Sequence, residues 1–210
     1  MKHSLNKKNF IRAIVLSILL SVTLLAFSYV VGKDNLFLLL NTDAGAFADA
    51  FFAGFTFGGD GIIWIPALLI VLFLLKRKDA VVLLVTSSIL STIFTQVIKN
   101  FIFPDEPRPT KAITTSNLIH IVDGVDVHSM GSFPSGHTAT AFCIYLLFCL
   151  LLPKRWWVAI GFLYAALVGY SRVYLAQHFP VDVGAGIIVA IVSVWLSVQV
   201  QEYWWKRKHS

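Results

Sequence analysis

The chain has 210 residues, of which 57% are hydrophobic and only 13% are charged. Soluble globular domains carry about 25% charged residues, so this composition excludes an ordinary soluble protein. The apolar residues also stand in long runs, which is the pattern of membrane-spanning helices. We therefore predict an all-α integral membrane protein, a bundle whose single domain covers residues 1–210.

Six spans are predicted in chain order, over residues 11–31, 61–75, 79–99, 135–152, 156–171 and 181–205. The first follows a basic segment, as a signal peptide would. Its apolar run is longer than the roughly 7–15 residues of a signal, and Tyr29–Lys33 is a poor cleavage site, so we expect it to remain. The second run is shorter than the about 20 residues needed to cross a bilayer, and it is expected to borrow upstream residues.

Two segments between the spans are expected at the membrane surface. Residues 33–60 mix apolar and acidic positions, and Thr42 or Asp43 is expected to cap a short interfacial helix. The apolar face of this helix would consist of Phe47, Ala50 and Phe51. Residues 103–133 form one long polar segment, interpreted as an outer-face loop, whose early prolines oppose helix formation.

The formal net charge of +6 falls in clusters that alternate along the chain. Basic residues precede the first apolar run and follow the second, fourth and last. Cytoplasmic loops carry an excess of Lys and Arg, so this alternation predicts that both termini are cytoplasmic in a bacterial-type inner membrane. Because the charge orients the chain in the bilayer, nucleic acid is not expected as a partner.

The tetrapeptide Pro134-Ser135-Gly136-His137 opens the fourth predicted span. Ser135 can cap the helix, and Gly136 lets an anion approach the backbone N–H groups. His137 then lies in the first turn, beside whatever the helix N-terminus binds. The alternative is an ordinary capped helix whose histidine contacts only lipid headgroups.

A second motif, Ser171-Arg172-x5-His178-x3-Asp182, joins the fifth and sixth spans. Since His178 precedes Asp182 by one short turn, we expect a hydrogen bond between imidazole and carboxylate that leaves the other ring nitrogen for attack. A metal site and a purely structural His–Asp pair are the alternatives. Against metal, Arg172 would repel a divalent cation and attract a phosphate.

Lys99 and Arg108-Pro109 form the third polar element. With the N-terminus inside, Lys99 closes the third span at the outer face, where the other two motifs also lie. A forked guanidinium suits phosphate oxygens, and lysine adds a compact point charge. Taken singly, each of these side chains could instead contact a lipid headgroup.

These motifs resemble those of the type 2 phosphatidic acid phosphatase family, which also includes vanadium haloperoxidases and glucose-6-phosphatase. That family is known by Lys-x6-Arg-Pro, Pro-Ser-Gly-His and Ser-Arg-x5-His-x3-Asp. The second and third occur here unaltered, whereas eight residues separate Lys99 from Arg108. Two prolines in the interval could absorb the extra length, and Lys111 is the nearest replacement for Lys99.

The resemblance implies a role for each of these residues. His178 would attack phosphorus to give a phosphohistidine, Asp182 would orient it, and His137 would protonate the leaving oxygen and later assist water. The non-bridging oxygens would be held by Lys99, Arg108, Ser135, the Gly136 amide and Arg172. The resemblance implies neither a metal nor another cofactor.

The sequence thus predicts a metal-independent lipid phosphatase whose site lies on the outer, periplasmic face. Candidate substrates are phosphatidic acid, phosphatidylglycerol phosphate, undecaprenyl pyrophosphate and the phosphates of lipid A. The alternatives are a phosphotransferase using the same site, a haloperoxidase, and a non-enzymatic transport or lipid-binding protein. Six spans argue against a haloperoxidase, and a transporter would place polar residues near mid-span.

Overall fold

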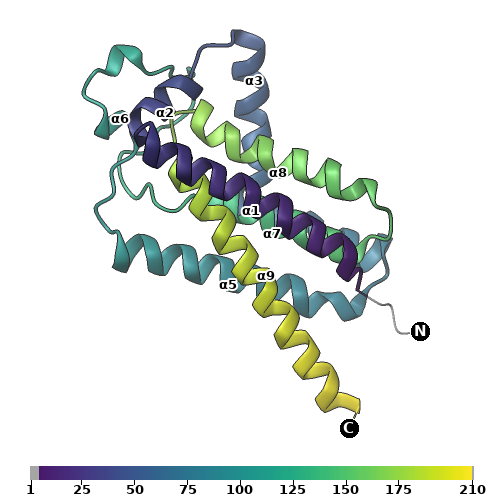
Figure 1. Cartoon of the computed structure of the whole chain (residues 1–210). Helices are drawn as coiled ribbons and strands as arrows, with labels where there is room; N and C mark the ends of the chain where they lie inside the picture. The colour runs from purple at the N-terminus through teal and green to yellow at the C-terminus, as the bar shows by residue number, and fades with distance from the viewer. Residues whose placement is uncertain (1–4, 210) are drawn as a thin grey trace.

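A computed structural model describes residues 5–209; residues 1–4 and 210 of the predicted domain lie outside this range. Within it the chain is helical and has no β-strand, which confirms the predicted all-α class (Figure 1). The helices are α1 (Lys7–Val30), α2 (Lys33–Leu40), α3 (Ala46–Phe55), α4 (Trp64–Leu69), α5 (Val81–Val97), α6 (Pro109–Ala112), α7 (Gly136–Leu151), α8 (Trp156–Tyr174) and α9 (Pro180–His209).

The helix α7 is the centre of the bundle. It packs against α1, α5, α8 and α9, and most of its side chains are buried. Its 16 residues span about 24 Å, less than the about 30 Å of a hydrocarbon core. A helix that is apolar on every side is stable in such a position, because other helices cover all its faces.

The helices around α7 differ in how much of their apolar surface the protein covers. Only 22% of the apolar window in Lys7–Val30 and 28% of that in Lys78–Ile102 is buried, against 67% in Pro180–Trp204. Therefore α9 lies largely inside the bundle, whereas α1 and α5 turn large apolar side chains outward. Such a surface is a membrane-facing surface, because soluble monomers rarely expose large apolar patches.

Within the described residues, four helices are long and apolar enough to cross a membrane: Lys7–Val30, Lys78–Ile102, Trp156–Tyr174 and Pro180–Trp204. They agree closely with the first, third, fifth and sixth predicted spans. The fourth corresponds to α7, which is shorter than this criterion requires. The chain is thus an integral membrane protein of several apolar helices.

The second predicted span, 61–75, differs most from the structure. The helical stretch Gly61–Leu74 follows Ala46–Gly59 after a bend of 59°, so the upstream residues do contribute but not in one straight helix. Asp60 causes the break: its backbone is extended, with ψ of 154°, and its carboxylate caps the next turn by accepting from the Ile62 N–H at 3.1 Å.

The start of α3 corrects another prediction. Its N-cap is Gly45, at φ +86°, and neither Thr42 nor Asp43 caps it. Asp43 Oδ1 instead accepts from the Gly45 N–H at 2.7 Å, two residues on, so this carboxylate stabilises the preceding turn. The expected apolar face is exposed on the protein surface, as the side chains of Phe47, Ala50 and Phe51 show.

The two ends of the bundle contain different parts of the chain. The start of α1 and the end of α9 lie together at one end, whereas α2, α6 and the long loops lie at the other (Figure 1). Asn41, which ends α2, is buried and donates to the carbonyls of Val173 and Tyr174 at the end of α8, at 3.1 and 2.8 Å. These bonds hold the loop end of the bundle together.

Candidate active site

Residues far apart in sequence meet at the loop end of the bundle. Lys99 lies in a π-helical turn, Ile98–Ile102, that continues α5, and Arg108 directly precedes α6. The other predicted site residues lie at the starts of α7 and α9 and at the end of α8, namely Ser135, Gly136, His137, Arg172, His178 and Asp182. The structure therefore brings every predicted site residue to one end of the protein.

The N-terminus of α7 is built as the sequence predicts, with Ser135 as its cap. The Ser135 hydroxyl accepts from the Thr138 N–H at 3.4 Å and from the Thr138 hydroxyl at 2.9 Å. The Ser135 N–H donates to the Asp182 carbonyl at 3.0 Å, which joins the starts of α7 and α9. Gly136 and His137 stay half-buried, so both remain partly accessible from the site.

His178 and Asp182 are almost completely buried side by side. The His178 Nδ1 lies 3.4 Å from Asp182 Oδ2, yet within the described residues Nδ1 has no hydrogen-bond partner. The predicted imidazole–carboxylate hydrogen bond is therefore not formed, although the pair is at ion-pair distance. The same Oδ2 accepts from the Ser132 hydroxyl and, at 2.9 Å, from the Phe179 N–H, which compete for it.

The backbone between α8 and α9 fixes the position of His178. The Arg172 carbonyl accepts from the N–H groups of both Gln177 and His178, at 2.9 and 3.0 Å. Ala176 adopts φ +53° in this turn, a conformation that residues other than glycine seldom adopt. One reversal of the chain thus places Arg172 and His178 at the same site.

Two arginines are buried at the site without a carboxylate partner. Arg108 Nη1 donates to the Gln177 carbonyl at 3.1 Å and to Gln177 Oε1 at 2.7 Å. Arg172 Nη1 donates to the Thr56 hydroxyl at 2.6 Å. Among the described residues neither guanidinium forms an ion pair. Since buried charges are normally paired, these groups are suited to hold an anion.

Lys99 remains close to the site despite the lengthened first motif. Its half-buried side chain runs beside Gly131, where an added Cβ would lie 3.3 Å from the lysine Cδ. Lys99 itself lies in the π turn Ile98–Ile102, which holds one more residue than an α-helical turn. Lys111 is exposed, and its Nζ contacts Met130 Sδ at 3.2 Å.

The electrostatic surroundings keep His178 neutral. Burial lowers the pKa of His178 well below its usual value, and the charges of Arg108, Arg172, Lys99 and His137 act in the same direction. Burial likewise lowers the pKa of Arg108. A neutral imidazole has a free lone pair, so His178 is in the form that can act as a nucleophile.

Three polar residues at the site were missed from the sequence. Ser132 binds the Asp182 carboxylate, Gln177 binds Arg108, and Thr56 binds Arg172. Ser132 and Gln177 are close neighbours of the recognised motifs, so their position in the chain could have marked them. Thr56 lies in a segment without any motif, and only the tertiary structure reveals it.

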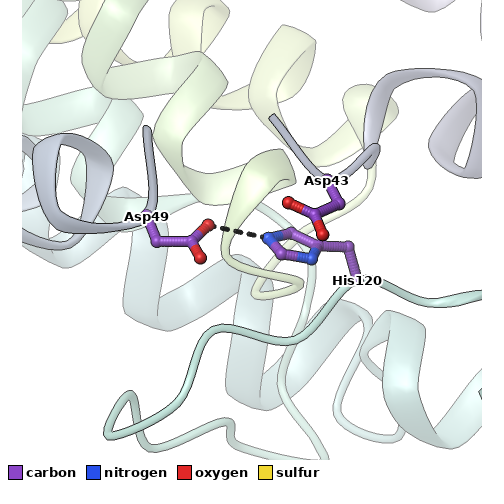
Figure 2. Close-up of side chains that lie close together, drawn as sticks. All are labelled: Asp43, Asp49 and His120. Carbon is purple, nitrogen blue, oxygen red and sulfur yellow. Dashed lines mark hydrogen bonds and ion pairs between the residues drawn. The ribbon is translucent and has the colours of Figure 1, made fainter. Parts of the chain in front are cut away.

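A second polar cluster lies beside the end of α8. Figure 2 shows Asp43, Asp49 and His120, whose potential metal-ligand atoms lie within 4.8 Å of one another. Asp49 Oδ1 is 2.9 Å from His120 Nε2 and also accepts from the Tyr174 hydroxyl at 2.6 Å. These hydrogen bonds explain why the side chains lie together, because they link α3, α8 and the loop that contains His120.

Taken together, the fold and the site describe a membrane protein in which two histidines, a carboxylate and three cationic side chains lie at one end of a helical bundle. Residues 80–206 match the family model described as the PAP2 superfamily. This match covers more than half of the chain, so the chain belongs to the PAP2 superfamily. The resemblance inferred from the motifs is thereby confirmed.

Similar proteins support this membership. A lipid A 4'-phosphatase of Bacteroides thetaiotaomicron is 30% identical over 169 residues, which cover 77% of this chain and 73% of that protein. An undecaprenyl-diphosphatase of Sulfolobus acidocaldarius is 28% identical and covers 80% and 77%. The crystal structure of Aquifex aeolicus LpxE is similar with a TM-score of 0.67 and 33% identity, covering 78% of this chain and 93% of that chain.

Proposed function

We propose that this protein is a membrane lipid phosphatase, a single-domain enzyme that hydrolyses a phosphomonoester or pyrophosphate headgroup. One observation carries the proposal: within the described residues, Arg108 and Arg172 are buried without a carboxylate partner at the same site as the buried His178. Such a centre attracts a phosphate and offers it a nucleophile. The names of the relatives, which act on lipid A and undecaprenyl diphosphate, support a lipid substrate.

In the first step the Nε2 of His178 attacks phosphorus, and the bond from phosphorus to the leaving oxygen breaks. His137 gives its proton to that oxygen, which departs as an alcohol or a phosphate. In the second step His137 removes a proton from water, the resulting hydroxide attacks phosphorus, and the N–P bond breaks to release inorganic phosphate. Asp182, anchored by Ser132 and the Phe179 N–H, stabilises the charge that develops on His178.

The cations stabilise the transition state. Lys99, Arg108 and Arg172 would hold the non-bridging oxygens, together with Ser135 and the Gly136 N–H at the start of α7. Uncatalysed hydrolysis of phosphate monoesters is so slow that accelerations of up to about 10²¹ are needed. Positive groups that are already in place before the substrate arrives are the main source of such stabilisation.

The same proposal includes the orientation of the chain. Within the described residues, six membrane passes are obtained when α7 and the bent pair Ala46–Gly59 and Gly61–Leu74 each count as one. The basic clusters support a topology in which both termini are cytoplasmic and the active site lies on the periplasmic face of an inner membrane. Cysteines introduced at Asp126 and Lys78 test this, because an impermeant thiol reagent should label only position 126 from outside.

The segments 33–60 and 103–133 surround the polar end of the bundle, so they would select the headgroup. A phosphotransferase would use the same phosphohistidine and pass the phosphoryl group to an acceptor other than water. Phosphate release in the absence of any acceptor distinguishes hydrolysis from transfer.

The test is phosphate release by purified protein in detergent from a panel of lipid A, undecaprenyl diphosphate and phosphatidic acid. His178→Ala should abolish release while the variant stays folded, because no nucleophile remains. The control is Lys154→Ala, which removes an exposed side chain at the opposite end of the bundle and should keep the wild-type rate. Wild-type phosphate release by His178→Ala would sink the mechanism.

The same assay tests whether a metal takes part. Activity should survive excess EDTA, and orthovanadate should inhibit by occupying the site as a mimic of pentacoordinate phosphorus. Loss of activity in EDTA that zinc or magnesium restores would reverse this assignment.

A further inference from the structure

The segment that joins α3 to α4 packs against the active site. It contains the 3-10 turn Thr56–Gly59 and the break at Asp60. This turn contacts both α7 and α8, the helices that carry His137 and Arg172. It lies outside residues 80–206, the part of the chain that the family model matches.

Thr56 is the side chain that holds Arg172. Both residues are buried, and Arg172 Nη1 donates to Thr56 Oγ1 at 2.6 Å. Within the described residues this is the one side-chain hydrogen bond of Arg172, and its Nε has no partner. A long side chain held at one N–H keeps its remaining donors for another acceptor, so the Thr56 hydroxyl contributes to where the guanidinium points.

Gly59 lies directly against His137. A Cβ added at Gly59 would stand 2.7 Å from the His137 carbonyl oxygen and 2.9 Å from its Cβ. It would also stand 2.6 Å from Val168 Cγ1, so any larger residue here must displace α7 or α8. The Gly58 carbonyl accepts from the Tyr164 hydroxyl, which fastens the turn to α8.

We propose that the turn Thr56–Asp60 is a positioning element of the active site, in which Thr56 aims the Arg172 guanidinium at the phosphate and Gly59 sets the position of His137. This inference rests on the proposed phosphatase function. It assigns a role to a part of the chain that contains none of the three motifs. The competing explanation is that Thr56 only satisfies a buried donor and has no influence on phosphate binding.

The test compares Thr56→Val, which removes the hydroxyl at nearly constant volume, with Thr56→Ser, which keeps it. Orthovanadate affinity is measured by calorimetry on the full-length protein in detergent, and kcat and KM are measured on the best lipid phosphate of the panel. Thr56→Val should weaken vanadate binding and lower kcat/KM by about tenfold or more, the range expected for a lost hydrogen bond to a charged group. Thr56→Ser should stay within about threefold of wild type.

A double-mutant cycle separates positioning from general structure. In an Arg172→Met background, Thr56→Val should have almost no further effect, because methionine offers the Thr56 hydroxyl no donor. The matched control Thr86→Val removes an exposed hydroxyl on α5 that bonds only within its own helix, and it should change neither quantity. Wild-type vanadate affinity in Thr56→Val, or an equal loss in both backgrounds, would overturn the proposal.

The second half of the proposal has its own pair of variants. Gly59→Ala should lower kcat more than it changes KM, because it pushes on His137 without removing any phosphate ligand. Gly61→Ala meets no atom within 4 Å and should behave as wild type. Unchanged kcat in Gly59→Ala would overturn the role of Gly59. His178→Ala in the same assay tests the phosphatase function itself. The assay therefore distinguishes a failure of the phosphatase proposal from a failure of the positioning role of the turn Thr56–Asp60.

Discussion

Residues 80–206 and residues 5–79 contribute to this protein in different ways. The first region carries the three motifs and supplies each histidine, carboxylate and cation assigned to the chemistry. The second region carries none of them, yet Thr56 holds Arg172 and Asn41 fastens the end of α8. The comparison teaches that some of the groups that position the reacting residues come from a part of the chain that carries no motif.

After the loss of the nucleophile itself, the largest effect is expected in the motif region, from Asp182→Asn. The amide keeps the shape of the carboxylate but cannot stabilise a charged His178, so kcat should fall by about 10³–10⁴. Steady-state kinetics on the best lipid phosphate measure this loss, with Glu202→Gln, which changes a carboxylate at the opposite end of the bundle, as the control. A kcat within tenfold of wild type would mean that Asp182 is structural, which would weaken the assignment of chemistry to this region.

A smaller effect within the same region should come from Lys99→Ala. Loss of a charge-assisted hydrogen bond to phosphate is worth roughly 1.5–3 kcal/mol, so kcat/KM should drop by about 10–150-fold. Lys111→Ala should stay within about threefold of wild type, because this side chain is exposed and lies beside Met130. If Lys111→Ala lowered kcat/KM more than Lys99→Ala, Lys111 would be the lysine of the first motif.

The smallest effect on catalysis is expected in the N-terminal region, from Asn41→Ala. Asn41 is buried and donates to the carbonyls of Val173, Tyr174 and His120, which would lose this donor in the variant. The free energy of unfolding should fall by about 1–3 kcal/mol while kcat changes little, as thermal unfolding and kinetics together would show.

Its matched control is Asn100→Ala, because Asn100 is exposed and bonds only to Gln96 on the same helix turn. That variant should change the free energy of unfolding by less than about 0.5 kcal/mol. If a stably folded Asn41→Ala protein lost much of its kcat, this residue of the N-terminal region would contribute to catalysis and not only to stability, which would contradict the comparison.

Much of the fold could be predicted because it depends on local pattern. Long apolar runs gave the helices, and the two unaltered motifs located His137, His178 and Asp182 near helix ends. The wrong predictions concern positions where several neighbouring residues could form the same local structure, such as a helix cap. The cap of α3 is Gly45 and not Thr42 or Asp43, because the backbone there turns through a positive φ that glycine adopts without strain.

The sequence by itself determined the class of this protein, since apolar run length and the spacing within each motif are properties of neighbouring residues. Only the tertiary structure decided which groups meet across long separations. It brings Ser132 to Asp182 Oδ2 across 50 positions of sequence and Thr56 to Arg172 across 116. Such contacts depend on how whole helices pack, and no local pattern of residues specifies that packing.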